Sequence, residues 1–198
     1  MERLRPAGRK PREENFAQAA VDAVLGLGED VQRTTHAPDL STQERWAKLR
    51  VLFRSRFNIP VMAQQSLGYH WATATGEQRR EFTALFETMI VGTYAARLGG
   101  YAAGDFRVTG RRDEGPNDAL VHTQVSGYGR PGFERIDWRV RTSADAQPRI
   151  IDVIVTGVSQ VMSAQEAFAA SIRADGSGLA GLIEQLRRDF PQPVGALE

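Results

Sequence analysis

Residues 135–141 read Arg-Ile-Asp-Trp-Arg-Val-Arg, a run in which apolar and charged side chains alternate. Because successive side chains of a β-strand point to opposite faces, Ile136, Trp138 and Val140 share one face, and the arginines share the other with Asp137. The charged face can lie in water, whereas the apolar face needs a cover. This stretch therefore predicts a sheet that is wet on one side and buried on the other.

Three further runs with strand character extend this sheet. They cover residues 106–108, 120–125 and 150–158, and turn-forming Gly, Pro, Asn and Asp lie between the runs. Connections this short suit hairpins, so we expect four strands in an antiparallel meander. Asp137 and Asp152 would then lie on neighbouring strands among Arg135, Arg139 and Arg149. Ion pairs across the strands explain these carboxylates better than acid–base catalysis does.

Helical periodicity precedes the strands. Apolar residues at helical spacing predict one helix over 13–27, ending at Gly26 and Gly28, and a second over about 76–98, ending at Gly99-Gly100. Two shorter helices are expected between them. The residues with the chemistry of N-caps are Ser41, Asn58 and Thr75.

Helical periodicity also follows the strands. Ser163 and Glu166 form a capping box that predicts the start of a helix, and the Asp-Gly-Ser-Gly run at 175–178 ends it. A last helix runs on to Phe190. Helices from both ends of the chain are therefore available to cover the apolar face of the sheet, and the expected class is α+β.

Length and composition indicate one globular domain. The chain has 198 residues, of which 41% are hydrophobic and 25% charged, and we expect a domain over 13–190 between a basic, flexible leader (1–12) and a tail (191–198). Outside the leader, acidic residues outnumber basic ones, so no nucleic-acid partner is expected. No run approaches 18 apolar residues, and no apolar secretion signal stands at the N-terminus.

The residues offer no catalytic constellation. The chain has no cysteine, which excludes thiol chemistry, disulfides and iron–sulfur ligation. His36, His70 and His122 do not stand at metal-ligand spacing, so neither a metal nor a cofactor is expected. The serines lie outside any nucleophile elbow. We therefore predict that the protein is not an enzyme.

A surplus of large apolar side chains remains, on elements that should face one sheet. Composition by itself favours an ordinary filled core over a hollow one, and hydropathy does not distinguish the two. The residues that would line a hollow are Phe57, Met62, Leu67, Trp71, Phe86, Met89, Ile90, Tyr94, Trp138, Ile154, Val158, Met162 and Phe168.

Several motifs together resemble one family. Phe-Asn-Ile-Pro-Val-Met-Ala at 57–63 and Ser-Leu-Gly-Tyr-His-Trp at 66–71 resemble its helical half, and the C-terminal helices from Phe168 resemble its last helices. Ile-Asp-Trp-Arg-Val at 136–140 and the run ending in Gly-Val-Ser at 151–159 resemble its sheet. The family is the MlaC-like, toluene-tolerance group of periplasmic lipid-binding proteins. The Asp-Trp-Arg strand is similar to its hopanoid-associated HpnM branch in particular.

The resemblance implies a curved antiparallel four-stranded sheet whose covering helices enclose an apolar pocket. It implies a carrier that shuttles phospholipid between the inner and outer membranes without catalysis, with the lipid tails against the thirteen apolar residues. It further implies a phospholipid or hopanoid-type lipid as ligand. The implied partners are an inner-membrane lipid ABC transporter complex and an outer-membrane lipoprotein complex, and the implied location is the periplasm, after removal of a signal peptide.

The sequence departs from the family at two places. Pro148 stands where the family usually has Trp or Tyr before the last strand, and Ala164-Gln165 stands where it has Tyr-Arg. The role of that arginine is therefore not carried over. Two alternatives stay open: a cone-shaped small-molecule enzyme of the ketosteroid-isomerase kind, and an envelope adaptor that binds partner proteins and no ligand.

Overall fold

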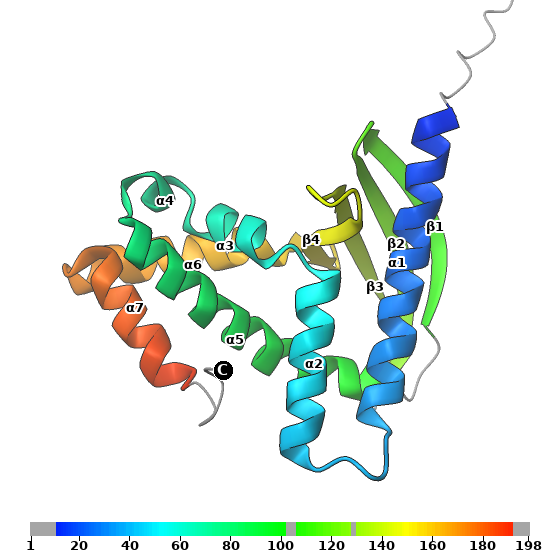
Figure 1. Ribbon diagram of the computed structural model, residues 1–198, viewed down its shortest axis with the longest axis horizontal. Helices are drawn as coiled ribbons and strands as arrows, with labels where there is room; N and C mark the ends of the chain where they lie inside the picture. Colours follow the sequence, from blue (N-terminus) through cyan, green and yellow to red (C-terminus); the bar gives the residue numbers. More distant parts are fainter. Residues whose placement is uncertain (1–10, 102–105, 128–129, 192–198) are drawn as a thin grey trace, which may run out of the picture.

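The computed structural model describes residues 11–101, 106–127 and 130–191 (Figure 1). Five helices come first, then a sheet, then two helices. The elements are α1 Pro11–Thr35, α2 Thr42–Arg56, α3 Ile59–Leu67, α4 Tyr69–Thr73, α5 Gly76–Tyr101, β1 Phe106–Gly115, β2 Asp118–Gly127, β3 Arg130–Thr142, β4 Pro148–Val155, β5 Val158–Ser159, α6 Gln160–Asp175 and α7 Gly178–Asp189. Of the expected leader and tail, residues 1–10 and 192–198 lie outside the described residues, while α1 begins at Pro11.

The helix starts expected in the first half of the chain are confirmed. The Ser41 hydroxyl accepts from the backbone N–H of Glu44, whose carboxylate accepts from the Ser41 N–H at 2.9 Å. The Asn58 side chain accepts from the N–H of Val61 at the start of α3. Thr75 and Gln78 bond each other reciprocally before α5. Local capping chemistry thus determines these starts.

The sheet is antiparallel and has five strands in the order β1-β2-β3-β4-β5. The expectation of four strands is wrong because the chain turns back after Val155. Thr156 and Gly157 both have positive φ, +49° and +88°, as a tight hairpin turn requires. Val158 and Ser159 therefore pair with β4 as a short fifth strand, with Val158 opposite Val155.

One face of the sheet is buried by the helices and the other is not. In β3, Trp138 lies opposite Val121 of β2 and Val153 of β4, and all three belong to one apolar cluster with residues of α1, α2, α3, α5, α6 and α7. In Figure 1, α1 runs across the sheet while α3, α5, α6 and α7 gather beside it. The predicted one-sided sheet is confirmed.

Two predicted helix ends are wrong. A Cβ on Gly26 would lie 3.2 Å from the Arg56 guanidinium of α2, and one on Gly28 would lie 3.2 Å from the Phe106 ring of β1. These glycines permit close packing, and α1 continues beyond them to Thr35. Val31, 2% exposed, continues the buried stripe of the helix. Likewise, α5 runs past Gly99-Gly100.

The start of α6 also differs from the prediction. Ser159 is the N-cap and accepts from the N–H of Met162 at 3.1 Å. Ser163 lies one turn inside the helix, where its hydroxyl donates to the Ser159 carbonyl. The tight turn delivers the chain straight into the helix, and the buried Asp152 accepts from the Ser159 hydroxyl at 2.7 Å and the Val161 N–H at 3.1 Å.

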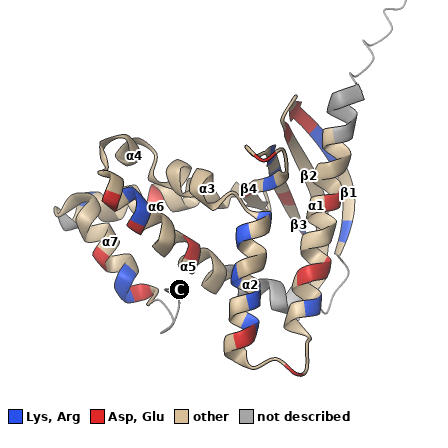
Figure 2. Cartoon of the chain, viewed as in Figure 1, with Lys and Arg blue, Asp and Glu red and all other residues tan. Residues whose placement is uncertain are grey.

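A buried ionic cluster joins α2 to α5. Five basic residues lie along α2, against one acidic residue (Figure 2). Two of them, Arg50 and Arg54, donate to the same carboxylate oxygen of Glu87 at 2.6 and 2.7 Å. The side chains of Arg50 and Glu87 are only 11% and 9% exposed. Removal of one partner would leave the other charge buried and uncompensated.

We therefore expect Glu87→Ala to lower the free energy of unfolding by about 3 kcal/mol, the usual result of breaking a buried ion pair. Equilibrium urea unfolding followed by circular dichroism measures this. Glu184→Ala is the matched control, because the Glu184 side chain is 56% exposed in its pair with Arg187 and such pairs contribute about 0–1 kcal/mol. Equal losses in the two variants would contradict the prediction.

Candidate functional site

Most of the predicted site residues meet in one apolar cluster that joins the helices to one another and to the inner face of the sheet. Seven of the thirteen lie in the central apolar cluster and are at most 7% exposed: Phe57, Met62, Leu67, Phe86, Ile90, Trp138 and Phe168. Trp71 and Met89 are partly buried and pack against the same cluster. Residues from α2–α3, α5, α6 and β3 thus converge on one layer.

Aromatic rings form the centre of this layer. Phe168 of α6 meets Phe82 and Phe86 of α5 edge-on, with ring centroids 5.5 and 6.4 Å apart. Phe53 stacks on Phe57 at 4.8 Å. Phe82 is fully buried but was not among the predicted site residues. Its place in the apolar stripe of α5, four residues before Phe86, is the signal that could have found it.

Trp138 contributes an apolar ring without an unpaired polar atom. Its indole N–H donates to the Thr123 hydroxyl at 3.0 Å, and that hydroxyl donates to the Ile136 carbonyl at 2.7 Å. Both hydrogen bonds lie within the sheet. The ring therefore faces the helices as a purely apolar surface, with Phe106 against it at 6.4 Å.

The structure places the other predicted residues elsewhere. Ile154 lies opposite Asp137 in the register, on the outer face of the sheet. Val158 and Met162 are 54% and 52% exposed around the start of α6. The side chain of Tyr94 lies outside the described residues. The expectation that all these elements face one side of the sheet thus fails for Ile154, because a strand sends alternate side chains to opposite faces.

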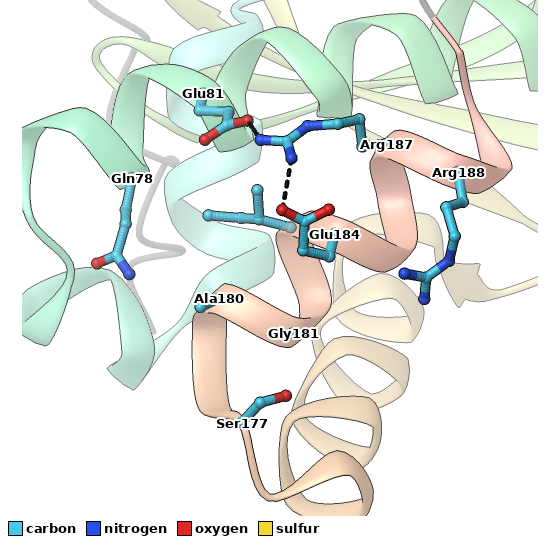
Figure 3. A pocket seen from close by; sticks show the side chains of 9 residues that line it. Gln78, Glu81, Ser177, Ala180, Gly181, Glu184, Arg187 and Arg188 are labelled. Atoms are coloured by element: carbon cyan, nitrogen blue, oxygen red, sulfur yellow. Dashed lines mark hydrogen bonds and ion pairs between the residues drawn. The ribbon is translucent and has the colours of Figure 1, made fainter.

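The hollows lined by described residues lie away from most of the predicted site residues. The hollow of about 420 Å³ in Figure 3 lies between α5 and α7, where Arg187 reaches Glu81 and Glu184. Another, of about 490 Å³, is lined by Glu29, Gln32 and Arg33 of α1 and by His36 directly after it. A third, of about 520 Å³, is lined by the end of α2, the start of α3 and the β3–β4 hairpin. Of the predicted residues, Phe57 alone lines any of these.

The described residues contain neither a metal site nor a membrane-spanning helix. No group of three His, Asp or Glu among them is arranged to hold a metal ion. No helix in the described ranges is long and apolar enough to cross a membrane. His122 lies on the outer face of the sheet, with its Nδ1 2.8 Å from an Asp137 carboxylate oxygen.

The outer face of the sheet carries paired charges. Burial raises the pKa of Asp137, but hydrogen bonds from Arg135 and His122 outweigh it and hold the pKa below the ordinary 3.8. In the same way, burial raises the pKa of Glu114, but Arg112 and Arg139 bring it below 4.5. The predicted ladder is confirmed for Arg139, 3.8 Å from Asp152 across the strands. Arg149 pairs with Asp145 of its own hairpin instead.

These lowered pKa values predict acid sensitivity. A carboxyl whose pKa is lower in the folded state stabilises the fold above its unfolded pKa, and this contribution is lost as the pH falls through the folded value. We expect the free energy of unfolding to fall between about pH 5 and pH 2, and to fall less in Asp137→Asn. Urea titrations across this range measure it. Asp39→Asn, in an exposed loop, should follow the unsubstituted protein, and an identical acid response in Asp137→Asn would refute the assignment.

The architecture is that of a one-sided antiparallel sheet whose inner face and accompanying helices share one apolar cluster. Residues 26–188 match the family model described as MlaC protein, and the chain therefore belongs to the MlaC family. No curated protein matches the chain. Among solved structures, a phospholipid-binding protein from Ralstonia solanacearum, determined in complex with a phospholipid, has the same fold. Its TM-score is 0.74 at 23% identity, covering 85% of this chain and 95% of that one.

Proposed function

We propose that this protein is a lipid carrier that holds the acyl tails of a phospholipid in the layer between its helices and the inner face of its sheet. The observation that carries the proposal is family membership over residues 26–188. It is supported by the shared fold with the phospholipid-bound Ralstonia protein and by the convergence of large apolar side chains on one layer. Nothing in this function requires a bond to be made or broken.

The proposed tail-binding residues are those of the apolar layer. They come from separate elements, so the layer widens if the helices move away from the sheet. They are Phe57, Met62, Leu67, Trp71, Phe86, Met89, Ile90, Trp138 and Phe168. Val158 and Met162, exposed near the start of α6, extend the proposed site to the surface. Tyr94 remains in the proposed set, whereas Ile154 faces away from this layer.

Burial of the tails supplies the free energy for this opening. Burial of one methylene is favourable by about 0.8 kcal/mol. Moving two acyl chains of about 14 methylenes each from water into an apolar site therefore gains on the order of 20 kcal/mol. This gain offsets the loss of contacts such as those among Phe82, Phe86 and Phe168. Because a bilayer buries the same tails equally well, such a site can accept lipid and release it again.

The finer assignments are part of the same proposal. We place the chain in the hopanoid-associated HpnM branch, with a phospholipid or hopanoid-type lipid as ligand and no cofactor. The carrier works in the periplasm, between an inner-membrane lipid ABC transporter complex and an outer-membrane lipoprotein complex. These assignments rest on the sequence motifs at 136–140 and 151–159 and on the family.

Native mass spectrometry of protein purified from a Gram-negative host tests the proposal. We expect a co-purifying phospholipid or related long-chain lipid in the unsubstituted protein. Met89→Arg should abolish this adduct, because a charge would enter the apolar layer. Ile90→Arg tests the next position on α5. Val51→Arg is the matched control, since Val51 is 67% exposed on α2, and it should keep the adduct.

Circular dichroism checks that each variant folds. Protein that is empty as purified and takes up no lipid from vesicles after delipidation would exclude a carrier and favour a ligand-free adaptor. Loss of the adduct in Val51→Arg, with retention in Met89→Arg and Ile90→Arg, would move the site out of the proposed layer.

A further inference from the structure

The outer face of the sheet displays arginines. We define it as the face opposite the helices, and in β3 it carries Arg135, Arg139 and Arg141. The register places Arg107 and Arg112 of β1 on the same face, through Gln124 and Leu120 of β2. Residues paired across antiparallel strands point to the same side, and Arg149 of β4 lies opposite Arg141, so the register gives the described part of this face six arginines.

The guanidinium groups stand above the carboxylates with which they pair. The side chains of Arg112, Arg135, Arg139 and Arg141 are 38–64% exposed. Their carboxylate partners are 5–26% exposed, with Asp152 and Asp137 the most deeply set at 5% and 6%. A molecule that approaches this face therefore meets guanidinium groups first.

The acids hold these arginines in place without using all their donors. Arg139 bonds Glu114 through its Nε at 3.0 Å, and Arg135 bonds Asp137 through its Nε at 2.9 Å and an Nη at 2.8 Å. Each guanidinium has five N–H donors in a planar fork that matches phosphate geometry. The partners of Arg135, Arg139 and Arg141 all come from the sheet. The arginines are thus held in place while several of their donors remain for another molecule.

An exposed aromatic ring completes the face. Phe133 of β3 lies opposite Ser126, which puts it on the outer side with Arg135. Phe133 is 47% exposed, and the Arg107 guanidinium lies 4.2 Å from the centroid of its ring. An apolar ring beside a guanidinium suits the boundary between lipid headgroups and acyl chains, where amphipathic pairs insert.

We propose that the outer face of the sheet docks onto the surface of an anionic lipid bilayer, with the arginines on headgroup phosphates and Phe133 inserted among them. A bilayer is favoured over an acidic protein because the half-exposed Phe133 stands beside the Arg107 guanidinium, and an apolar ring next to a cation suits the boundary between headgroups and acyl chains. This docking is independent of what the apolar layer holds, since the two sites lie on opposite sides of the sheet.

Sedimentation with vesicles tests the docking. The full chain should sediment with vesicles of phosphatidylglycerol and phosphatidylcholine in equal parts, and not with pure phosphatidylcholine. Each basic side chain near such a surface contributes a factor of about five in partitioning, so Arg107→Gln with Arg112→Gln should weaken binding about 25-fold. About 0.5 M salt should abolish it by screening. Phe133→Ser should weaken it without changing the charge.

The matched control is Arg33→Gln with Arg188→Gln, which removes the same charge from exposed positions on α1 and α7 and should leave vesicle binding unchanged. If this control loses as much binding as the β1 double variant, binding reports net charge and the proposal is wrong. If the unsubstituted chain does not sediment with anionic vesicles, the membrane-docking proposal is wrong, and an acidic protein becomes the favoured partner of this face. Native mass spectra of the β1 double variant should still show bound lipid, which separates a failure of docking from a failure of the carrier proposal.

Discussion

Burial of one face of the sheet is the constraint on which the rest of the structure depends. Trp138 can face the helices because Thr123, on the neighbouring strand, takes up its indole N–H within the sheet. This face is part of one apolar cluster that joins described segments from α1 to α7. The same strand turns Arg135, Arg139 and Arg141 to water. A shift of register by one residue would exchange the two faces and remove the core.

The close approach of elements that are distant in sequence depends on a few local features. Gly26 and Gly28 let α1 lie against Arg56 and Phe106. The turn at Thr156-Gly157 brings the chain from β4 back to the edge of the sheet. There Asp152 receives the first turn of α6, so a buried carboxylate ties the last helices to the sheet.

The two faces of the sheet have different proposed functions: the inner face binds the lipid tails, and the outer face docks onto a bilayer. The inner face, with the helices, buries hydrocarbon by a non-directional interaction that costs nothing to reverse when a bilayer takes the lipid back. The outer face offers guanidinium groups held by low-lying carboxylates, which suit phosphate. A carrier needs both properties, and a one-sided sheet supplies them from the alternate residues of one strand.

The sequence by itself determined what depends on neighbours along the chain: the alternation of residues 135–141, the caps at Ser41, Asn58 and Thr75, the α+β class and the family. Only the tertiary structure decided that Gly26 and Gly28 lie inside a helix, that Val158 begins a fifth strand, that Ser159 caps α6, and that Arg50 and Arg54 share the buried Glu87. It also placed Ile154 on the outer face of the sheet and left Val158 and Met162 exposed. The physical reason is the same in each case. A glycine, a serine or an isoleucine has the same local pattern whether or not another element packs against it, and that packing partner comes from a distant part of the chain.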